Sequence, residues 1–118
     1  MDKKTILVVD DDPGNIDLLV GILKDKFTIK AARNGQIALK VSRLADSPDL
    51  VLLDILMPEM DGYEVCRQLK ADPSTSAIPV IFLSGETVDA SKYGAACYIS
   101  KPIDREKLMF AIESALMA

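Results

Sequence analysis

The sequence contains no histidine and only two cysteines among its 118 residues. Without histidine, the chain cannot itself supply a Ser-His-Asp or Cys-His catalytic group, a histidine-ligated zinc or a phosphohistidine. Basic residues are also few, with 14 lysines and arginines against 18 aspartates and glutamates. Nonspecific nucleic-acid binding needs a basic surface, so we do not expect it here. The chemistry of this chain therefore has to rest on carboxylates, hydroxyls, a lysine or a metal ion.

Long hydrophobic runs are absent as well. No stretch reaches the roughly 20 apolar residues of a membrane span, and the run Thr5–Val9 is too short for a secretory signal. At 49% hydrophobic residues, the chain is suited to one buried core, since a domain of this size buries about two thirds of its unfolded surface. We therefore expect one cytoplasmic domain over residues 1–118. Cys66 and Cys97 are interpreted as reduced core or near-core residues rather than a redox pair.

Five short apolar runs predict β-strands, at Thr5–Val9, Phe27–Ala32, Leu50–Leu53, Ile78–Leu83 and Cys97–Ser100. The third run, L-V-L-L, does not alternate with polar residues, which is typical of a strand covered on both faces. Apolar residues with helical spacing lie between and after these runs. They predict four buried helix faces: Ile16, Leu19, Val20 and Leu23; Ile37, Val41, Leu44 and Ala45; Val65, Cys66 and Leu69; and Leu108, Ala111, Ile112 and Ala115.

Capping residues mark where the helices begin. Asp12, Asp61 and Asp104 each precede a helical stripe, and we interpret Asp12 as an N-cap rather than a metal ligand. Glu64 gives Asp61 the spacing of a capping box. Only the segment from Gly85 to Tyr93 has too few apolar residues to support a helix of normal length. Strands and helices otherwise alternate from end to end, which predicts an α/β fold with a mostly parallel sheet and helices on both faces.

Polar residues follow the strands at the points where the strands end. The first run is followed by the aspartates 10–12, the third by Asp54, the fourth by Ser84 and the fifth by Lys101. Ligands of open α/β sheets bind beyond the carboxyl ends of the strands, so we expect these groups to meet at one edge. Clustered carboxylates need a compensating cation, and Mg²⁺ takes carboxylate oxygens together with other oxygens. With a lysine and a hydroxyl nearby, the pattern favours phosphoryl transfer through an aspartyl phosphate.

Four stretches together resemble the receiver domain of bacterial two-component response regulators, close to the chemotaxis type of single-domain regulator. They are I-L-V-V-D-D-D-P-G-N (6–15), L-V-L-L-D-I-L-M-P-E-M-D-G (50–62), P-V-I-F-L-S-G (79–85) and G-A-A-C-Y-I-S-K-P (94–102). The resemblance covers essentially the whole chain. It implies a flavodoxin-like, doubly wound sheet of five parallel strands in the order 2-1-3-4-5. It also implies a phosphorylation-dependent signalling switch rather than an enzyme.

The resemblance assigns roles to individual residues. Asp54 would accept a phosphoryl group from the phosphohistidine of a sensor histidine kinase or a phosphotransfer protein. Asp10, Asp11 and Asp54 would bind Mg²⁺, together with the backbone carbonyl of Leu56. Such a protein assists its own phosphorylation and dephosphorylation and does not bind nucleic acid directly. The resemblance also allows a dimer that forms on phosphorylation, and it leaves the output partner open.

Three further roles follow from the same resemblance. Ser84 would be the switch hydroxyl that moves toward the phosphoryl group, and Lys101 would pair with that group. Tyr98 would be an aromatic residue that rotates inward on activation, and the bond between Lys101 and Pro102 would be cis. Each side chain also has a simpler interpretation: Ser84 as a hydroxyl bonded to its own loop, Lys101 as a surface lysine, and Tyr98 as a half-buried strand residue.

Two features depart from the family pattern. The segment between Ser84 and Gly94 is shorter than in the usual receiver by about one and a half helical turns. The fourth helix is therefore expected to be short or irregular, and the partner surface that most family members use there is expected to differ. Leu56 lies two residues beyond the acceptor, where its apolar side chain cannot orient a water molecule. This predicts a longer-lived phosphorylated state than in relatives with a polar residue at this position.

Two other functions fit parts of the sequence. Asp10 to Asp12 contain the D-x-D spacing of haloacid-dehalogenase-type phosphatases, in which Asp10 would be the nucleophile. The hydroxyl residue that normally follows that motif is missing. A pseudo-receiver that binds partners without being phosphorylated is the other alternative. Phosphate trapped at Asp10 with turnover of phosphate esters would indicate the phosphatase, whereas phosphate trapped at Asp54 without turnover would indicate the switch.

Overall fold

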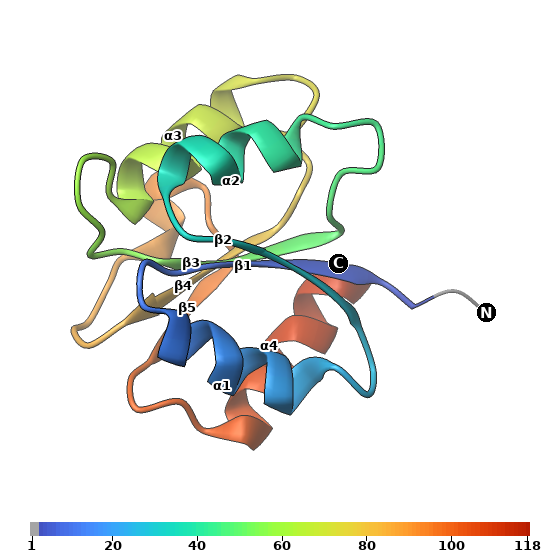
Figure 1. The fold of residues 1–118 in the computed structure, drawn as a ribbon. Helices are drawn as coiled ribbons and strands as arrows, with labels where there is room; N and C mark the ends of the chain where they lie inside the picture. Colours follow the sequence, from blue (N-terminus) through green and yellow to red (C-terminus); the bar gives the residue numbers. More distant parts are fainter. Residues whose placement is uncertain (1–2) are drawn as a thin grey trace.

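The computed structural model describes residues 3–118, in which one sheet is covered by helices on both faces (Figure 1). All neighbouring strands are parallel, and their order is β2-β1-β3-β4-β5. The predicted fold with strand order 2-1-3-4-5 is confirmed. The elements in chain order are β1 (Thr5–Val9), α1 (Pro13–Leu23), β2 (Thr28–Ala32), α2 (Gly35–Ser42), β3 (Leu50–Asp54), α3 (Gly62–Ala71), β4 (Val80–Ser84), the 3₁₀-helix η1 (Ala90–Tyr93), β5 (Cys97–Ser100) and α4 (Arg105–Met117).

The sheet has a separate apolar layer on each face. Strand residues alternate between the layers: in β1, Leu7 packs toward α2 and α3, whereas Val8 packs toward α1 and α4. Every residue of β3 is buried, as the L-V-L-L run predicts for a strand covered on both faces. Cys66 lies in the first layer and Cys97 borders the second. The two free thiols are therefore on opposite faces of the sheet and do not form a redox pair.

The parallel register brings the strand ends to the same edge. Val9 is aligned with Leu53 across β1 and β3, and Asp54 with Leu83 across β3 and β4. The end of β5 is aligned with the end of β4. The polar residues that end or follow these strands therefore leave the sheet at one edge, as the alternation of strands and helices predicts.

Helix α2 buries a different face from the one predicted by its apolar spacing. Ile37 and Leu44 are 43% and 50% exposed, whereas Ala38 is fully buried. A Cβ added to Gly35 would lie only 2.8 Å from Sδ of Met60. The buried face of α2 consists of Gly35, Ala38, Leu39 and Ser42, so mostly small residues pack closely on the core while Ile37 faces solvent. Of the predicted stripe, Val41 is partly buried against the apolar layer under α2 and α3, whereas the prediction is wrong for Ile37, and Leu44 and Ala45 lie exposed beyond the end of α2.

The predicted N-caps are confirmed. Asp12, Asp61 and Asp104 each accept a hydrogen bond from a backbone N–H in the first turn of α1, α3 and α4. The capping box at the start of α3 is only half formed. The Glu64 carboxylate accepts hydrogen bonds from side chains one turn later in α3 rather than turning back to the cap.

The helices are short. Within residues 3–118, the longest is α4 with 13 residues, and none is long and apolar enough to cross a membrane. Between β4 and β5 the chain forms only the four-residue η1, which ends at Gly94 with a φ of 79°. Glycine accepts this left-handed conformation without strain. The expectation of a short or irregular fourth helix is confirmed.

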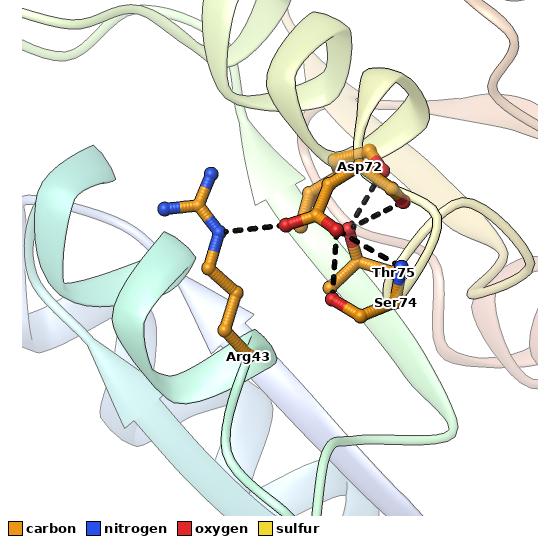
Figure 2. A network of polar contacts seen from close by, with 5 residues as sticks. Arg43, Asp72, Ser74 and Thr75 are labelled. Atoms are coloured by element: carbon orange, nitrogen blue, oxygen red, sulfur yellow. Dashed lines mark hydrogen bonds and ion pairs between the residues drawn. The ribbon is translucent and has the colours of Figure 1, made fainter.

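A network of polar contacts ties the end of α3 to the end of α2 (Figure 2). Asp72 accepts hydrogen bonds from the N–H and the hydroxyl of Ser74, at 2.9 and 2.8 Å, and from Nε of Arg43 at 3.1 Å. The Thr75 hydroxyl donates to the carbonyl oxygen of Leu69 at 2.7 Å. The hydrogen bonds from Ser74, and after them the contact with Arg43, lower the pKa of Asp72. This network lies where α3 leads into β4, at the edge of the sheet opposite the polar strand ends.

Candidate functional site

Three carboxylates converge at the edge of the sheet beyond β1 and β3. One oxygen of each of Asp10, Asp11 and Asp54 lies within 4.8 Å of the others. Asp10 and Asp11 follow β1 directly, whereas Asp54 is the last residue of β3. The structure thus brings together the three acidic residues that the strand ends single out in the sequence.

Asp10 is enclosed by the protein. It is 1% exposed, its Oδ1 accepts a hydrogen bond from the Asp12 N–H at 2.9 Å, and its Oδ2 is buried without a partner among the described residues. Burial raises the pKa of Asp10, the hydrogen bond from Asp12 offsets part of this rise, and the Asp54 carboxylate adds to it. A buried carboxylate oxygen without a partner is destabilising. The cluster is therefore short of positive charge.

The donor set fits a hard divalent cation. All three side chains offer carboxylate oxygens, which Mg²⁺ takes readily in proteins. A cation would supply the positive charge that the unpartnered Oδ2 of Asp10 lacks. Asp12 does not belong to the donor set, because its side chain accepts a hydrogen bond from the Gly14 N–H at 2.8 Å and caps α1.

Lys101 brings a positive charge to the same edge from just beyond β5. Its Nζ lies 2.8 Å from Oδ1 of Asp54, whose side chain is only 7% exposed. The backbone N–H of Lys101 donates to the carbonyl oxygen of Ser84 at 2.8 Å, which fixes the end of β5 beside the end of β4. The peptide bond between Lys101 and Pro102 is cis, as the family resemblance implies. The lysine is thus held where it meets the carboxylate at the end of β3.

Ser84 borders the same cavity as Asp54 but bonds its own loop. The Ser84 hydroxyl donates to the carbonyl oxygen of Glu86 at 2.8 Å and accepts from the Glu86 N–H at 3.0 Å. This is the simpler of the two interpretations of Ser84, and its role as a switch stays a prediction. The cavity has a volume of about 550 Å³, and its lining includes Asp54, Leu56, Tyr63, Ser84, Glu86 and Lys101.

The side chains of Leu56 and Tyr98 differ in their relation to this cavity. The Leu56 side chain lies at its rim and is 84% exposed. Tyr98 is half-buried in β5, packs against the apolar layer under α2 and α3, and does not line the cavity. The structure therefore does not bring Tyr98 to the carboxylates. Its role stays a prediction, as does metal binding by the Leu56 carbonyl.

Gly62 is a residue of the site that sequence reasoning treats only as a turn. Its N–H donates to the carbonyl oxygen of Ile55 at 2.8 Å. A Cβ at Gly62 would lie 2.8 Å from Cα of Ile55 and closer still to the carbonyl oxygen of Asp54. The start of α3 thus packs directly on the backbone of Asp54, an approach that requires glycine. The Asp61-Gly62 pair, so soon after a strand that ends in aspartate, is the signal that could have identified it.

Comparisons with known proteins show which family this chain resembles. The family model for the response regulator receiver domain matches residues 6–113. Protein PilH of Pseudomonas aeruginosa is 38% identical over 117 residues, which are 94% of this chain and 96% of PilH. A probable cyclic di-GMP phosphodiesterase of Vibrio cholerae is 50% identical over 105 residues, which are 84% of this chain but 23% of that protein. The chain thus spans about a quarter of the length of the Vibrio relative.

Solved structures have the same fold. The receiver domain of a signal transduction histidine kinase from Syntrophus aciditrophicus has a TM-score of 0.88 and 35% identity, covering 97% of this chain and 90% of that one. The receiver domain of a sensor histidine kinase from Pseudomonas aeruginosa PAO1 has a magnesium ion coordinated in its active-site cleft. At a TM-score of 0.89 and 22% identity, covering 98% of this chain and 99% of that one, it shows the likeness of fold alone. The family match favours a receiver over a haloacid-dehalogenase-type phosphatase. With its match over residues 6–113 and its likeness to PilH, this chain belongs to the response regulator receiver domains, the phosphoacceptor switches of two-component signalling.

Proposed function

We propose that residues 1–118 form one receiver domain in which Asp54 is the phosphoacceptor, and that phosphorylation of Asp54 changes partner binding. The observation that carries the proposal is the 2.8 Å contact between Lys101 and Asp54 beside two further carboxylates. A lysine in this place pairs with the oxygens of a phosphoryl group once Asp54 carries one. The proposed donor is the phosphohistidine of a sensor histidine kinase or a phosphotransfer protein, since this chain has no histidine.

Mg²⁺ is the proposed cofactor. Asp10, Asp11 and Asp54 would hold it, with the backbone carbonyl of Leu56 as a further ligand. The buried and unpartnered Oδ2 of Asp10 supports this assignment, because a cation removes the cost of that isolated charge. When bound, the ion neutralises negative charge as a phosphoryl group approaches the carboxylates.

In the proposed transfer, a carboxylate oxygen of Asp54 bonds to phosphorus while the bond from phosphorus to the donor imidazole nitrogen breaks. The imidazole keeps the electron pair of the broken bond, and its proton balance is restored from solvent. Lys101 stays paired with the charge of the transferred group, and Ser84 exchanges its bonds to Glu86 for one to a phosphoryl oxygen. Tyr98 follows this change by turning inward. The chain thus assists its own phosphorylation and dephosphorylation and is a phosphoacceptor rather than an enzyme.

The proposed output is binding of a protein partner. The net charge of −4 argues against direct binding to nucleic acid, and a dimer formed on phosphorylation belongs to the same proposal. We do not transfer the phosphodiesterase activity of the Vibrio relative, because this chain matches 23% of that protein. A reducing, cytoplasmic compartment, in which Cys66 and Cys97 stay as thiols, is part of the same proposal.

Incubation with acetyl phosphate and Mg²⁺, followed by intact-protein mass measurement, tests the proposal. We expect the wild-type protein to gain one phosphoryl group and Asp54→Asn to gain none. Asp72→Asn, which alters a carboxylate at the opposite edge of the sheet, is the matched control and should be labelled like the wild type. Equal labelling of Asp54→Asn and wild type would show that the acceptor assignment is wrong. Loss of labelling in both Asp54→Asn and Asp72→Asn would point to a folding defect.

A further inference from the structure

Three aromatic rings from three elements form a cluster on the α3 side of the sheet. Tyr63 of α3 stacks on Tyr93 of η1, with ring centroids 4.3 Å apart and ring planes inclined by 24°. Phe82 of β4 makes T-shaped contacts with both rings, at centroid distances of 5.5 Å to Tyr63 and 6.0 Å to Tyr93. Such ring pairs contribute beyond the area they bury. The stack is therefore a specific attachment of η1 to α3.

The backbone hydrogen bonds of η1 span only a single turn, so contacts with α3 and the apolar layer help to hold it in place. This helix has four residues, and the side chain of its N-cap, Asp89, accepts a hydrogen bond from the Ser91 hydroxyl at 2.8 Å but none from a backbone N–H. So short a helix is not stable by itself. The Cys66 thiol of α3 donates to the carbonyl oxygen of Tyr93 at 3.3 Å. Val88 and Ala90 are each 8% exposed and belong to the same apolar layer. The position of η1 thus depends on how this segment sits against α3.

Tyr63 belongs both to this attachment and to the cavity at Asp54. Its side chain lines the cavity together with Asp54, Ser84 and Glu86, while its ring stacks on Tyr93. Burial raises the pKa of the Tyr63 hydroxyl, and the neighbouring Tyr93, the Asp61 carboxylate at the start of α3 and Glu86 raise it further. The Tyr63 side chain therefore borders both the turn after β4, at Glu86, and the helix η1, at Tyr93.

We propose that the Tyr63–Tyr93 stack transmits the phosphorylation state of Asp54 to η1, so that the surface formed by α3 and η1 differs between the two states. This inference rests on the proposed phosphorylation of Asp54. A phosphoryl group brings up to two negative charges and three strong acceptor oxygens into the cavity. Those oxygens compete for the Ser84 hydroxyl, which now donates to the neutral carbonyl of Glu86.

The proposed switch lies in the hydrogen bonds of Ser84, which differ between the two states of Asp54. When the hydroxyl turns to the phosphoryl group, the donor and acceptor bonds that hold Glu86 are both lost. The Glu86 carboxylate is then also repelled by the new negative charge, so the turn changes its conformation beside Tyr63. Tyr63 forms the wall of the cavity beside this turn, and a shift of the turn changes how its ring meets Tyr93. Tyr63 acts here as a positioning residue, because its effect passes through Tyr93.

Hydrogen exchange tests the inference. Amide exchange of residues 86–95 is measured with and without acetyl phosphate and Mg²⁺, and the phosphorylated fraction of each sample is measured by intact mass. In the wild type we expect phosphorylation to speed exchange in this segment by about three- to tenfold, the range expected when one aromatic stack opens. Tyr63→Phe keeps the ring and should give the same increase. In Tyr63→Leu, the amides of residues 86–95 should exchange fast already before phosphorylation, and phosphorylation should increase their exchange rate by less than about twofold.

Two further variants keep the test decisive. Tyr93→Leu removes the second ring without altering the cavity lining and should behave like Tyr63→Leu, also in the event that Tyr63→Leu does not fold. Tyr98→Leu should keep the wild-type increase, and loss of the increase in that variant alone would overturn the proposal in favour of Tyr98.

The failures of the two proposals have different signatures. A merely structural Tyr63 would give fast exchange in Tyr63→Leu in both states while the full increase on phosphorylation is retained, and that result would overturn the inference. So would unchanged exchange in fully phosphorylated wild-type protein. Wild-type protein that takes up no phosphoryl group would instead contradict the proposed function itself.

Discussion

The carboxylates of Asp72 and Asp10, at opposite edges of the sheet, differ in their hydrogen-bond partners and in the direction of their pKa shifts. Asp72 accepts hydrogen bonds from Ser74 and Arg43, and these contacts lower its pKa (Figure 2). Asp10 has one oxygen bonded to a backbone N–H and the other buried without a partner within residues 3–118, and burial raises its pKa. Proteins usually satisfy buried polar groups, whereas exceptions with perturbed pKa values cluster at functional sites. The contrast therefore separates a structural edge of the sheet, at Asp72, from a working edge, at Asp10, Asp11 and Asp54.

The working edge remains deficient in positive charge even though Lys101 is present. The lysine is bonded to Asp54, which leaves Asp10 and Asp11 to repel each other and Asp54. The apolar layers on both faces of the sheet hold this cluster in place. A cation that binds this site would stabilise the folded protein. The same site offers a carboxylate that can receive a phosphoryl group.

The largest expected effect is on phosphorylation of the working edge. Lys101→Met should slow phosphorylation of Asp54 by about 10²–10³-fold, the usual loss when one preorganised charge-stabilising group is removed. The rate of mass gain with acetyl phosphate and Mg²⁺ measures it. Lys107→Met, which removes an exposed lysine of α4, is the control and should keep the wild-type rate. An undiminished rate in Lys101→Met would mean that the contact with Asp54 is only structural.

The next effect concerns the close packing behind Asp54. Gly62→Ala should destabilise the protein by about 3 kcal/mol, the upper part of the range for overpacking, because the added Cβ meets backbone atoms. Urea unfolding measures this free energy. Gly21→Ala is the matched control, since a Cβ at Gly21 meets nothing within 4 Å, and it should stabilise α1 by about 0.5–1 kcal/mol. If both variants had wild-type stability, the packing of α3 on the Asp54 backbone would not be as tight as described.

Replacing Asp10 and Asp72 by asparagine, each in a separate variant, tests the difference between the two edges. In the absence of Mg²⁺, Asp10→Asn should stabilise the protein by about 1–2 kcal/mol, because it removes an unpaired buried charge. Asp72→Asn should lower stability, because it weakens the hydrogen bonds from Ser74 and Arg43. Thermal unfolding at neutral pH compares the two. If both substitutions changed the stability in the same direction, the proposed difference between the two edges would be wrong.

The smallest expected effect concerns the lifetime of the phosphorylated state. Leu56→Asn should shorten the lifetime of the acyl phosphate by up to about tenfold, well below the 10²–10⁴ of a general base, because an amide only orients water. Decay of the phosphorylated mass over time measures it. Leu44→Asn changes another exposed leucine, which is 50% exposed and does not line the cavity, and should leave the lifetime unchanged. Equal lifetimes in wild type and Leu56→Asn would refute the role of Leu56.

The arrangement at the working edge was predictable because it follows from local patterns. Each strand run predicts its own end, and parallel strands of an alternating α/β chain end at one edge. The positions of Asp10, Asp54 and Lys101 after three such runs are therefore enough to bring them together. The N-caps were predictable for the same reason, since a cap depends on residues within one turn.

Contacts between distant segments were not predictable from one sequence. The buried face of α2 depends on how closely Gly35 approaches Met60, and apolar spacing alone favours the bulky Ile37, which is exposed. The stack of Tyr63 on Tyr93 joins residues that share no periodic pattern. These features depend on distances between elements, which periodicity does not contain.

Chemical location of the phosphoryl group tests the central claim most directly. Borohydride reduces an aspartyl phosphate to homoserine, so the acceptor is identified by peptide mass analysis after treatment with acetyl phosphate and Mg²⁺. We expect homoserine in place of Asp54 and at no other aspartate. Homoserine in place of Asp10 or Asp11, or folded protein that yields none, would contradict the assignment of Asp54 as the phosphoacceptor.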